Sequence, residues 1–207
     1  MEQLWSTDSL SRIIITGYKM RAFIISQPKA GTYLCSALLA ELGMTQTYKH
    51  IGSGGYQQYD PNNLEGGRAN PAYYTRVMEM NDALSTVEDG AFAVGHIEYD
   101  PKFVAYLLDF KKVLMTRDKE ETYQSMKNFW AETTREGGPP HSNQHGNIAN
   151  WGGDDVFPMD FWDLININVQ KIDELQVYLF GEVRVDSAEA MQRALDAPSL
   201  TKAKARG

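Results

Sequence analysis

The 207-residue sequence contains one cysteine, Cys35, so no disulfide can form within the chain. Disulfides are common in secreted proteins and rare in reducing compartments, and we therefore expect a cytoplasmic protein. No apolar run approaches the roughly 20 residues that a membrane-spanning helix needs. The first residues, Met1 to Arg12, mix charges of both signs and lack a signal-peptide core. We accordingly expect no membrane span.

Positive charge is also scarce. The chain has 20 Lys and Arg against 27 Asp and Glu, which gives a formal net charge of −7. Nucleic-acid-binding proteins generally present clustered cations to the phosphate backbone, so we expect no nucleic-acid partner. A small polyanionic ligand is still compatible with this balance where a few cations and backbone N–H groups converge.

The remaining composition is that of an ordinary globular protein, with 43% hydrophobic and 23% charged residues. A chain of this length is long enough for one well-buried core. We therefore expect a single domain over 1–207, with 1–19 as a loose N-terminal extension and 198–207 as a frayed tail.

Short apolar runs alternate with segments of helical periodicity. Runs rich in β-forming residues predict strands at 22–26, 91–95, 112–116 and 182–185. Helices are predicted at 32–42, 73–84, from Pro101, at 119–134, at 161–179 and from Asp186, with Asp100 and Asp186 as capping residues. This alternation favours an α/β fold of three layers, α/β/α, with a central parallel sheet, like that of P-loop nucleotide hydrolases.

The first predicted strand runs into the loop Gln27-Pro28-Lys29-Ala30-Gly31-Thr32-Tyr33, which opens the first predicted helix. A helix N-terminus offers unpaired N–H groups and the positive end of the helix dipole, which suits a phosphate. Gly31 would let the backbone approach the anion, Lys29 adds a cation and Thr32 a hydroxyl. The loop is not a Walker A motif. A tight turn with a solvated lysine is the alternative.

Two further polar positions follow predicted strands, where ligands bind in open parallel sheets. His96 ends the strand at 91–95, and a histidine can act as a general base near neutral pH. Arg117 follows the strand at 112–116, with Ser125 eight residues later, and an arginine can bind a phosphate with two N–H groups. The alternatives are a structural His96 and an Arg117 paired with a nearby acid, Asp118 or Glu121.

Together these residues resemble the sulfotransferases that use 3′-phosphoadenosine 5′-phosphosulfate. That family carries a P-K-[SA]-G-T-type loop, matched by residues 28–32, and a histidine at the end of a middle strand, matched by His96. It also has an arginine after a strand with a serine eight positions on, matched by Arg117 and Ser125. The resemblance covers about half of the chain, from Arg21 to Trp130.

The resemblance implies transfer of a sulfuryl group from this co-substrate to the hydroxyl of an acceptor, a small molecule or carbohydrate, without a metal. His96 would be the base and Lys29 a second catalytic residue. The implied cofactor-binding set is Lys29, Ala30, Gly31, Thr32 and Tyr33 for the 5′-phosphosulfate, and Arg117 and Ser125 for the 3′-phosphate.

The sequence departs from this family at three places. Lys119 stands where the family usually has a proline, and Tyr33 where a tryptophan commonly follows a threonine pair. The family's late R-K-G-x-x-G-type loop is not found in 201–207, which read TKAKARG. These departures keep two alternatives open, a catalytically silent nucleotide-binding module and a nucleotide or nucleoside kinase with a variant phosphate loop.

Two glycine-rich segments, 50–72 and 137–156, are predicted as long loops that line the acceptor pocket. Tyr56, Tyr59 and Trp151 would stack on a sugar or ring there; incidental loop aromatics are the alternative. His141 and His145 have the i, i+4 spacing that converges on a metal only within a helix, and the Gly and Pro residues before them favour a loop.

Overall fold

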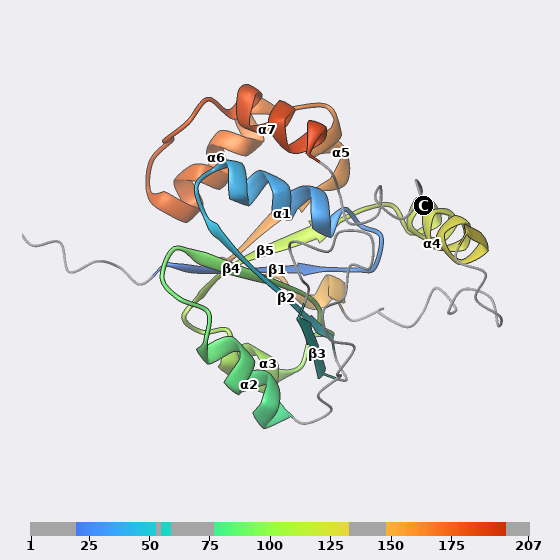
Figure 1. Cartoon of the computed structure of the whole chain (residues 1–207), viewed down its shortest axis with the longest axis vertical. Helices are drawn as coiled ribbons and strands as arrows, with labels where there is room; N and C mark the ends of the chain where they lie inside the picture. Colours follow the sequence, from blue (N-terminus) through green and yellow to red (C-terminus); the bar gives the residue numbers. More distant parts are fainter. Residues whose placement is uncertain (1–19, 53–54, 59–76, 133–147, 198–207) are drawn as a thin grey trace, which may run out of the picture.

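The computed structural model describes residues 20–52, 55–58, 77–132 and 148–197 (Figure 1). The predicted extension at 1–19 and tail at 198–207 lie outside the described residues. In chain order the elements are β1 (Arg21–Ser26), α1 (Thr32–Glu41), β2 (Thr45–Gly52), β3 (Gly55–Gln58), α2 (Val77–Ser85), β4 (Ala91–His96), α3 (Pro101–Tyr106), β5 (Phe110–Thr116), α4 (Lys119–Glu132), η1 (Ile148–Asn150), β6 (Val156–Asp160), α5 (Phe161–Ile165), α6 (Val169–Phe180) and α7 (Ser187–Asp196).

The strands of the described residues form one sheet in the order β3-β2-β4-β1-β5-β6. All neighbouring pairs are parallel except β2 and β3, which pair antiparallel at one edge. The first strand, β1, lies between β4 and β5, with Ile25 opposite Gly95 and Ser26 opposite Met115. The predicted central parallel sheet with flanking helices is thus confirmed.

Successive side chains along a strand point to opposite faces of the sheet, and each face has its own hydrophobic core. In β1, Ala22 and Ile24 belong to the core shared with α1, α6 and α7, whereas Phe23 and Ile25 belong to the core on the α2 and α3 side. Figure 1 shows these helices above and below the sheet. Because both faces are covered, the central strands are apolar on both sides, as parallel strands require.

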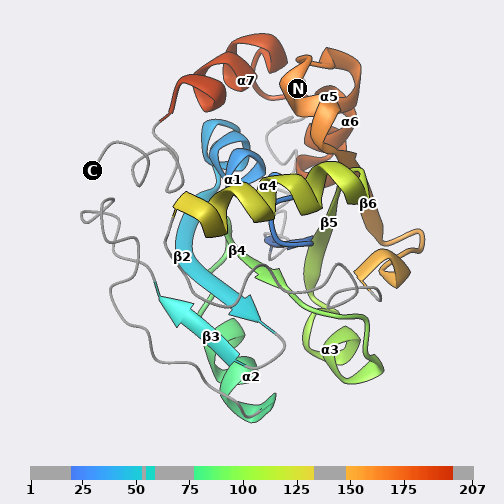
Figure 2. The ribbon, with the colours of Figure 1, turned by 90° about the vertical axis from the view of Figure 1, so that its right-hand side faces the viewer.

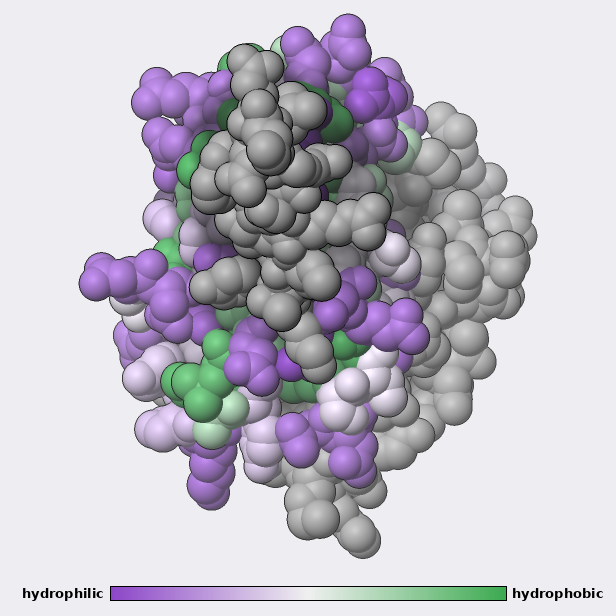
Figure 3. Space-filling model, turned by 90° about the vertical axis from the view of Figure 1, so that its left-hand side faces the viewer, coloured by the Kyte–Doolittle hydropathy of each residue, from purple (hydrophilic) through white to green (hydrophobic). Residues whose placement is uncertain are grey.

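Helix α4 is placed differently from the helices that cover the faces. In Figures 1 and 2 it lies beyond the carboxyl ends of the strands, beside the loop that joins β1 to α1. Figure 3 views the opposite end, where the coloured surface is largely hydrophilic with small hydrophobic groups. The described site residues predicted from the sequence all follow carboxyl ends of strands or lie on α4. No helix in the described ranges is long and apolar enough to cross a membrane.

Three strands were missed by the sequence reasoning. β2 and β3 occupy residues predicted as connection and as the start of the loop at 50–72, and β6 overlaps the end of the predicted loop at 137–156. Pro158 interrupts the apolar pattern of β6 and is exposed. Its missing N–H is tolerated because β6 is an edge strand of the sheet that the described residues form.

Two predictions near the C-terminus were wrong. The single helix predicted at 161–179 is divided into α5 and α6, because Ile167 has a positive φ of 51° and Asn168 caps a new helix. Residues 182–185 are not a strand. Their backbone is held instead by the side chain of Gln176, whose oxygen accepts from Arg184 N–H and Val185 N–H at 2.9 and 3.1 Å.

Candidate functional site

The topology gathers the predicted residues at one end of the sheet. Because β4, β1 and β5 are neighbouring parallel strands, their carboxyl ends meet. The loop after β1 therefore lies between His96, which ends β4, and Arg117, which follows β5. The helices after β1 and β4 lead to strands on opposite sides of β1, which is the switch in strand order where α/β sheets usually bind ligands.

The loop between β1 and α1 is a tight turn with unusual backbone angles. Ala30 N–H donates to the Gln27 carbonyl at 3.1 Å. Lys29 and Gly31 have positive φ values of 69° and 101°. Helix α1 then begins with no side chain capping it, whereas α3, α5, α6 and α7 each begin at a capping Asp or Asn. The first N–H groups of α1 are thus suited to an anion.

Packing also requires a glycine at position 31, independently of any approach to an anion. A Cβ at this position would lie 2.7 Å from Phe161 Cδ2 and 3.3 Å from Met115 Cε. The Phe161 ring also carries the Arg117 guanidinium, whose central carbon is 4.0 Å from the ring centroid. Phe161 therefore packs against both the loop and Arg117, and it was not identified from the sequence.

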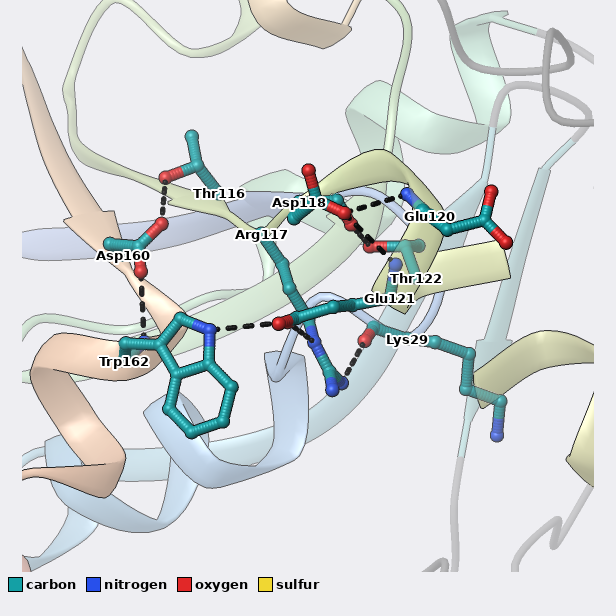
Figure 4. A network of polar contacts seen from close by, with 9 residues as sticks. All are labelled: Lys29, Thr116, Arg117, Asp118, Glu120, Glu121, Thr122, Asp160 and Trp162. Atoms are coloured by element: carbon teal, nitrogen blue, oxygen red, sulfur yellow. Dashed lines mark hydrogen bonds and ion pairs between the residues drawn. The ribbon is translucent and has the colours of Figure 1, made fainter. Parts of the chain in front are cut away.

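Arg117 fixes the loop from the other side. Its Nη1 donates to the Lys29 carbonyl at 3.2 Å and its Nε to Glu121 Oε2 at 3.1 Å (Figure 4). The same carboxylate oxygen accepts from Trp162 Nε1 at 3.1 Å. The pairing with Glu121, one of the two alternatives considered for Arg117, is thus observed. Asp118 instead caps α4, since its Oδ1 accepts from the backbone N–H groups of Glu120 and Glu121.

The other two predicted phosphate-binding side chains are not gathered around Arg117. Figure 4 shows the Lys29 side chain running away from the guanidinium. Its Nζ lies 3.4 Å from the centroid of the Phe129 ring on α4. Ser125 lies on α4, partly buried, and among the described residues it makes no hydrogen bond to Arg117. Among the described residues, Arg117 contacts the loop through the Lys29 carbonyl, and no contact joins Ser125 to either residue.

His96 is held by the end of β1. Its Nδ1 lies 2.7 Å from the Ser26 carbonyl oxygen and 3.2 Å from Ser26 Oγ. A carbonyl oxygen only accepts, so Nδ1 carries a proton in this contact, and the neutral ring has its basic lone pair on Nε2. Ser26 Oγ is also 2.5 Å from Thr32 Oγ1. The histidine is thereby tied to the first residue of α1.

A second histidine, His50, stands beside the first. The rings of His50 and His96 have centroids 4.4 Å apart and an interplanar angle of 72°. Tyr33 places its hydroxyl 3.4 Å from His50 Nδ1. Sequence reasoning missed His50 because its segment was taken for a loop. The run from Thr45 to Gly52 alternates poorly between apolar and polar residues, so its pattern indicated a strand only weakly.

Trp151, expected to stack on an acceptor, has another role. It is 2% exposed and its Nε1 donates to the Ile97 carbonyl at 2.9 Å. It therefore belongs to the core and anchors the chain directly after His96. Tyr56 lies in β3. The remaining acceptor and metal candidates, Tyr59, His141 and His145, lie outside the described residues, and within those described no cluster of three or more His, Cys, Asp or Glu suits a metal ion.

The chain has a mostly parallel sheet with helices on both faces and a strand-loop-helix unit at its centre. No protein-family model matches the chain, and no curated protein matches its sequence.

Among solved structures, the mouse sulfotransferase SULT7A1 in complex with PAP is similar, with a TM-score of 0.55 at 11% sequence identity. The match covers 87% of this chain and 65% of that chain, so the present chain spans just under two thirds of that sulfotransferase. At this identity the likeness establishes a sulfotransferase-like α/β fold.

Proposed function

We propose that the chain is a sulfotransferase that moves a sulfuryl group from 3′-phosphoadenosine 5′-phosphosulfate to an acceptor hydroxyl. One observation carries the proposal: helix α1 opens without a capping side chain at a loop that Arg117 holds by the Lys29 carbonyl. His96 adjoins the same helix start through Ser26 and Thr32. In this proposal the anion site and the base lie together at the switch point of the sheet, which supports the assignment.

The residues present fit a doubly phosphorylated nucleotide. The backbone N–H groups of residues 30–33 and the Lys29 ammonium supply donors for the 5′-phosphosulfate. A guanidinium has five N–H donors, and the two hydrogen bonds of Arg117 to protein atoms use only Nε and one donor on Nη1. In the proposal the other donors of Arg117, together with the hydroxyl of Ser125, hold the 3′-phosphate.

The donor supplies the activated sulfuryl group, and the chain's residues position it and manage charge. As the acceptor oxygen bonds to sulfur, the bond from sulfur to the bridging phosphate oxygen breaks. His96 Nε2 takes the acceptor's proton, which its fixed tautomer allows. Lys29 and the amides at the start of α1 stabilise the negative charge that develops on the leaving oxygen.

Calorimetric titration tests the binding half of the proposal. We expect 3′-phosphoadenosine 5′-phosphate to bind much more tightly than ADP or 5′-AMP, and Arg117→Ala to weaken the bisphosphate at least tenfold. Arg184→Ala is the matched control, because Arg184 lies in the connection between α6 and α7. Equal binding of all three nucleotides would reduce the site to a generic phosphate site.

Turnover with an acceptor panel tests the chemical half. Lys29→Ala should lower turnover by on the order of 10²-fold or more, as the loss of one oxyanion donor does elsewhere. Lys102→Ala, an exposed lysine on α3, should leave it unchanged. Unchanged turnover in the Lys29 variant would remove that residue from the mechanism.

One observation favours a second candidate, a nucleotide-binding module without turnover. Arg117 Nε lies 3.1 Å from Glu121 Oε2, so the arginine has a structural ion-pair partner within the chain. Tight nucleotide binding without transfer to any acceptor on the panel would support this candidate over the enzyme.

A further inference from the structure

The side chains of His50 and His96 are in direct contact. The rings meet edge to face at a centroid distance of 4.4 Å. The pairing of β2 with β4 makes the contact: Gly52 is opposite His96, and His50, two residues earlier, lies on the same face of the sheet. The two rings are therefore diagonal neighbours on adjacent strands at the carboxyl edge of the sheet.

The outer atoms of this pair contact the end of β1 and the first turn of α1. On one side, His96 Nδ1–H donates to the Ser26 carbonyl at 2.7 Å. On the other, the Tyr33 hydroxyl lies 3.4 Å from His50 Nδ1, and the Tyr33 and His50 rings are themselves edge to face. The pair thus spans from the first strand to the first turn of α1.

The charged and titratable groups around the pair come from several elements. Tyr33 faces it from α1, and Lys29 lies in the adjoining loop with its ammonium over Phe129. Lys49 precedes His50 on β2, and Glu98 follows His96 by two residues. In direct ring contact, each histidine is the other's titratable neighbour.

We infer that His50 is a positioning residue for His96, and that the two imidazoles titrate as one coupled pair. This inference rests on the proposed role of His96 as base. The His50 ring packs edge to face against His96, while Ser26 holds His96 Nδ1, and the two contacts together fix the plane of the His96 ring. A proton on either ring disfavours a proton on the other, so the pair resists double protonation and keeps one neutral imidazole available at lower pH than two separate histidines would.

The expected size follows from Coulomb repulsion between two unit charges at this separation. It corresponds to roughly 0.7 pH unit at the dielectric constant of water and to roughly three at an effective constant of 20. Both side chains are partly buried, so we expect the two protonation steps of the pair to be separated by one pH unit or more. The two apparent pKa values then belong to the pair and not to either ring.

Histidine ring resonances followed by NMR against pH test the coupling without any substrate. The chain has four histidines, which single His→Gln variants assign. In the wild type, the His50 and His96 resonances should each respond to both steps. In His50→Phe, which keeps an aromatic ring, His96 should titrate in a single step whose midpoint lies between the two wild-type steps. His50→Gln should give the same result if the phenylalanine variant does not fold.

Independent one-step curves for both histidines, with His96 unmoved in the variants, would overturn the inference. The pH profile of kcat/KM provides the second arm: the acid limb of His50→Phe should follow the single His96 step seen by NMR. Coupled titration of the two histidines without any sulfuryl transfer would contradict the proposed function and would still support the coupling of His50 with His96. If sulfuryl transfer occurs but the acid limb of its kcat/KM profile is the same in the wild type and in His50→Phe, a positioning role for His50 is excluded.

Discussion

Replacing Gly31 by alanine is the sharpest test of how the loop between β1 and α1 is held. Gly31 has a φ of 101°, and a Cβ there would lie 2.7 Å from Phe161 Cδ2. A left-handed backbone costs an L-residue about 1–2 kcal/mol, and forcing a methyl group into a packed site costs roughly 1–3 kcal/mol more. We therefore expect Gly31→Ala to lower the free energy of unfolding by about 2–5 kcal/mol, a large part of a typical domain's stability.

Gly43 provides a matched control within the same chain. Its φ is 95°, close to that of Gly31, yet a Cβ there would have no atom within 4 Å. Gly43→Ala should therefore lose only the conformational part, about 1–2 kcal/mol. The difference between the two variants measures the collision with Phe161, and Phe161→Ala in the Gly31→Ala background should recover that difference in a double-mutant cycle.

Urea unfolding at fixed pH, followed by circular dichroism, provides the midpoints and slopes. A Gly31 variant no less stable than the Gly43 variant would refute the packing of Phe161 against the loop. So would a cycle with no coupling between Gly31 and Phe161. Calorimetric titration of folded Gly31→Ala then measures whether the variant still binds the bisphosphate nucleotide.

Three further predictions concern charge and burial. Glu121→Gln should tighten binding of the bisphosphate nucleotide by roughly two- to fivefold. The substitution removes the ion pair with Glu121 that would compete with the nucleotide for Arg117, and partly exposed ion pairs of this kind are weak. The hydrogen bond from buried Lys112 lowers the pKa of Asp155. The stabilising effect of this ion pair is therefore present above pH ~4 and lost as the pH falls through the folded pKa. Because the Asp155 side chain is 69% exposed, Asp155→Asn should lower the free energy of unfolding by about 1 kcal/mol or less at neutral pH, and this difference should narrow on acidification. Burial raises the pKa of the Cys35 thiol to about 12, so Ellman's reagent at pH 8 should react at the rate of unfolding.

Each of these has a neighbouring control. Glu120→Gln changes a carboxylate that bonds Gln124 instead of Arg117 and should leave nucleotide affinity unchanged. Asp154→Asn removes an equal charge beside the Lys112 ion pair and should not alter the acid limb of stability. For the thiol, reaction of the native protein as fast as that of the urea-unfolded chain would contradict the burial of Cys35.

The central part of the fold was predictable because local pattern and tertiary environment agree there. Strands β1, β4 and β5 are buried on both faces, so their short apolar runs stand out in the sequence. The start of α3 was equally clear, since Asp100 accepts from Lys102 N–H and Pro101 opens the helix. Caps and buried runs are local signals that neighbouring elements reinforce.

The edges of the sheet were not predictable in the same way. Strand β2 is rich in polar residues and its register with β4 shifts between Gln46 and His50. Strand β6 contains Pro158, which is acceptable only because the strand is at an edge. Both strands are stabilised by pairing with a neighbour that is distant in the sequence, so the local pattern alone does not reveal them.

The site divides along the same line. The residues on the loop and at two strand ends were identified from their order in the chain, and the topology brings them to one end of the sheet. His50 and Phe161 were not assigned a role at the site, because each contacts it only through a partner contributed by another element. Contacts of that kind leave no spacing rule in the sequence.

Arg117 joins the stability of the loop to the binding of a ligand. Its guanidinium holds the Lys29 carbonyl, lies on Phe161 and pairs with Glu121, so the loop conformation and the charge state around Arg117 are linked. A phosphate that binds Arg117 more strongly than the Glu121 carboxylate does would displace that carboxylate without releasing the Lys29 contact. Linkage then requires that loosening the loop weakens the ligand and that the ligand steadies the loop by the same free energy. If the loop is the anion site, Gly31→Ala should therefore gain less stability than the wild type from the same concentration of nucleotide.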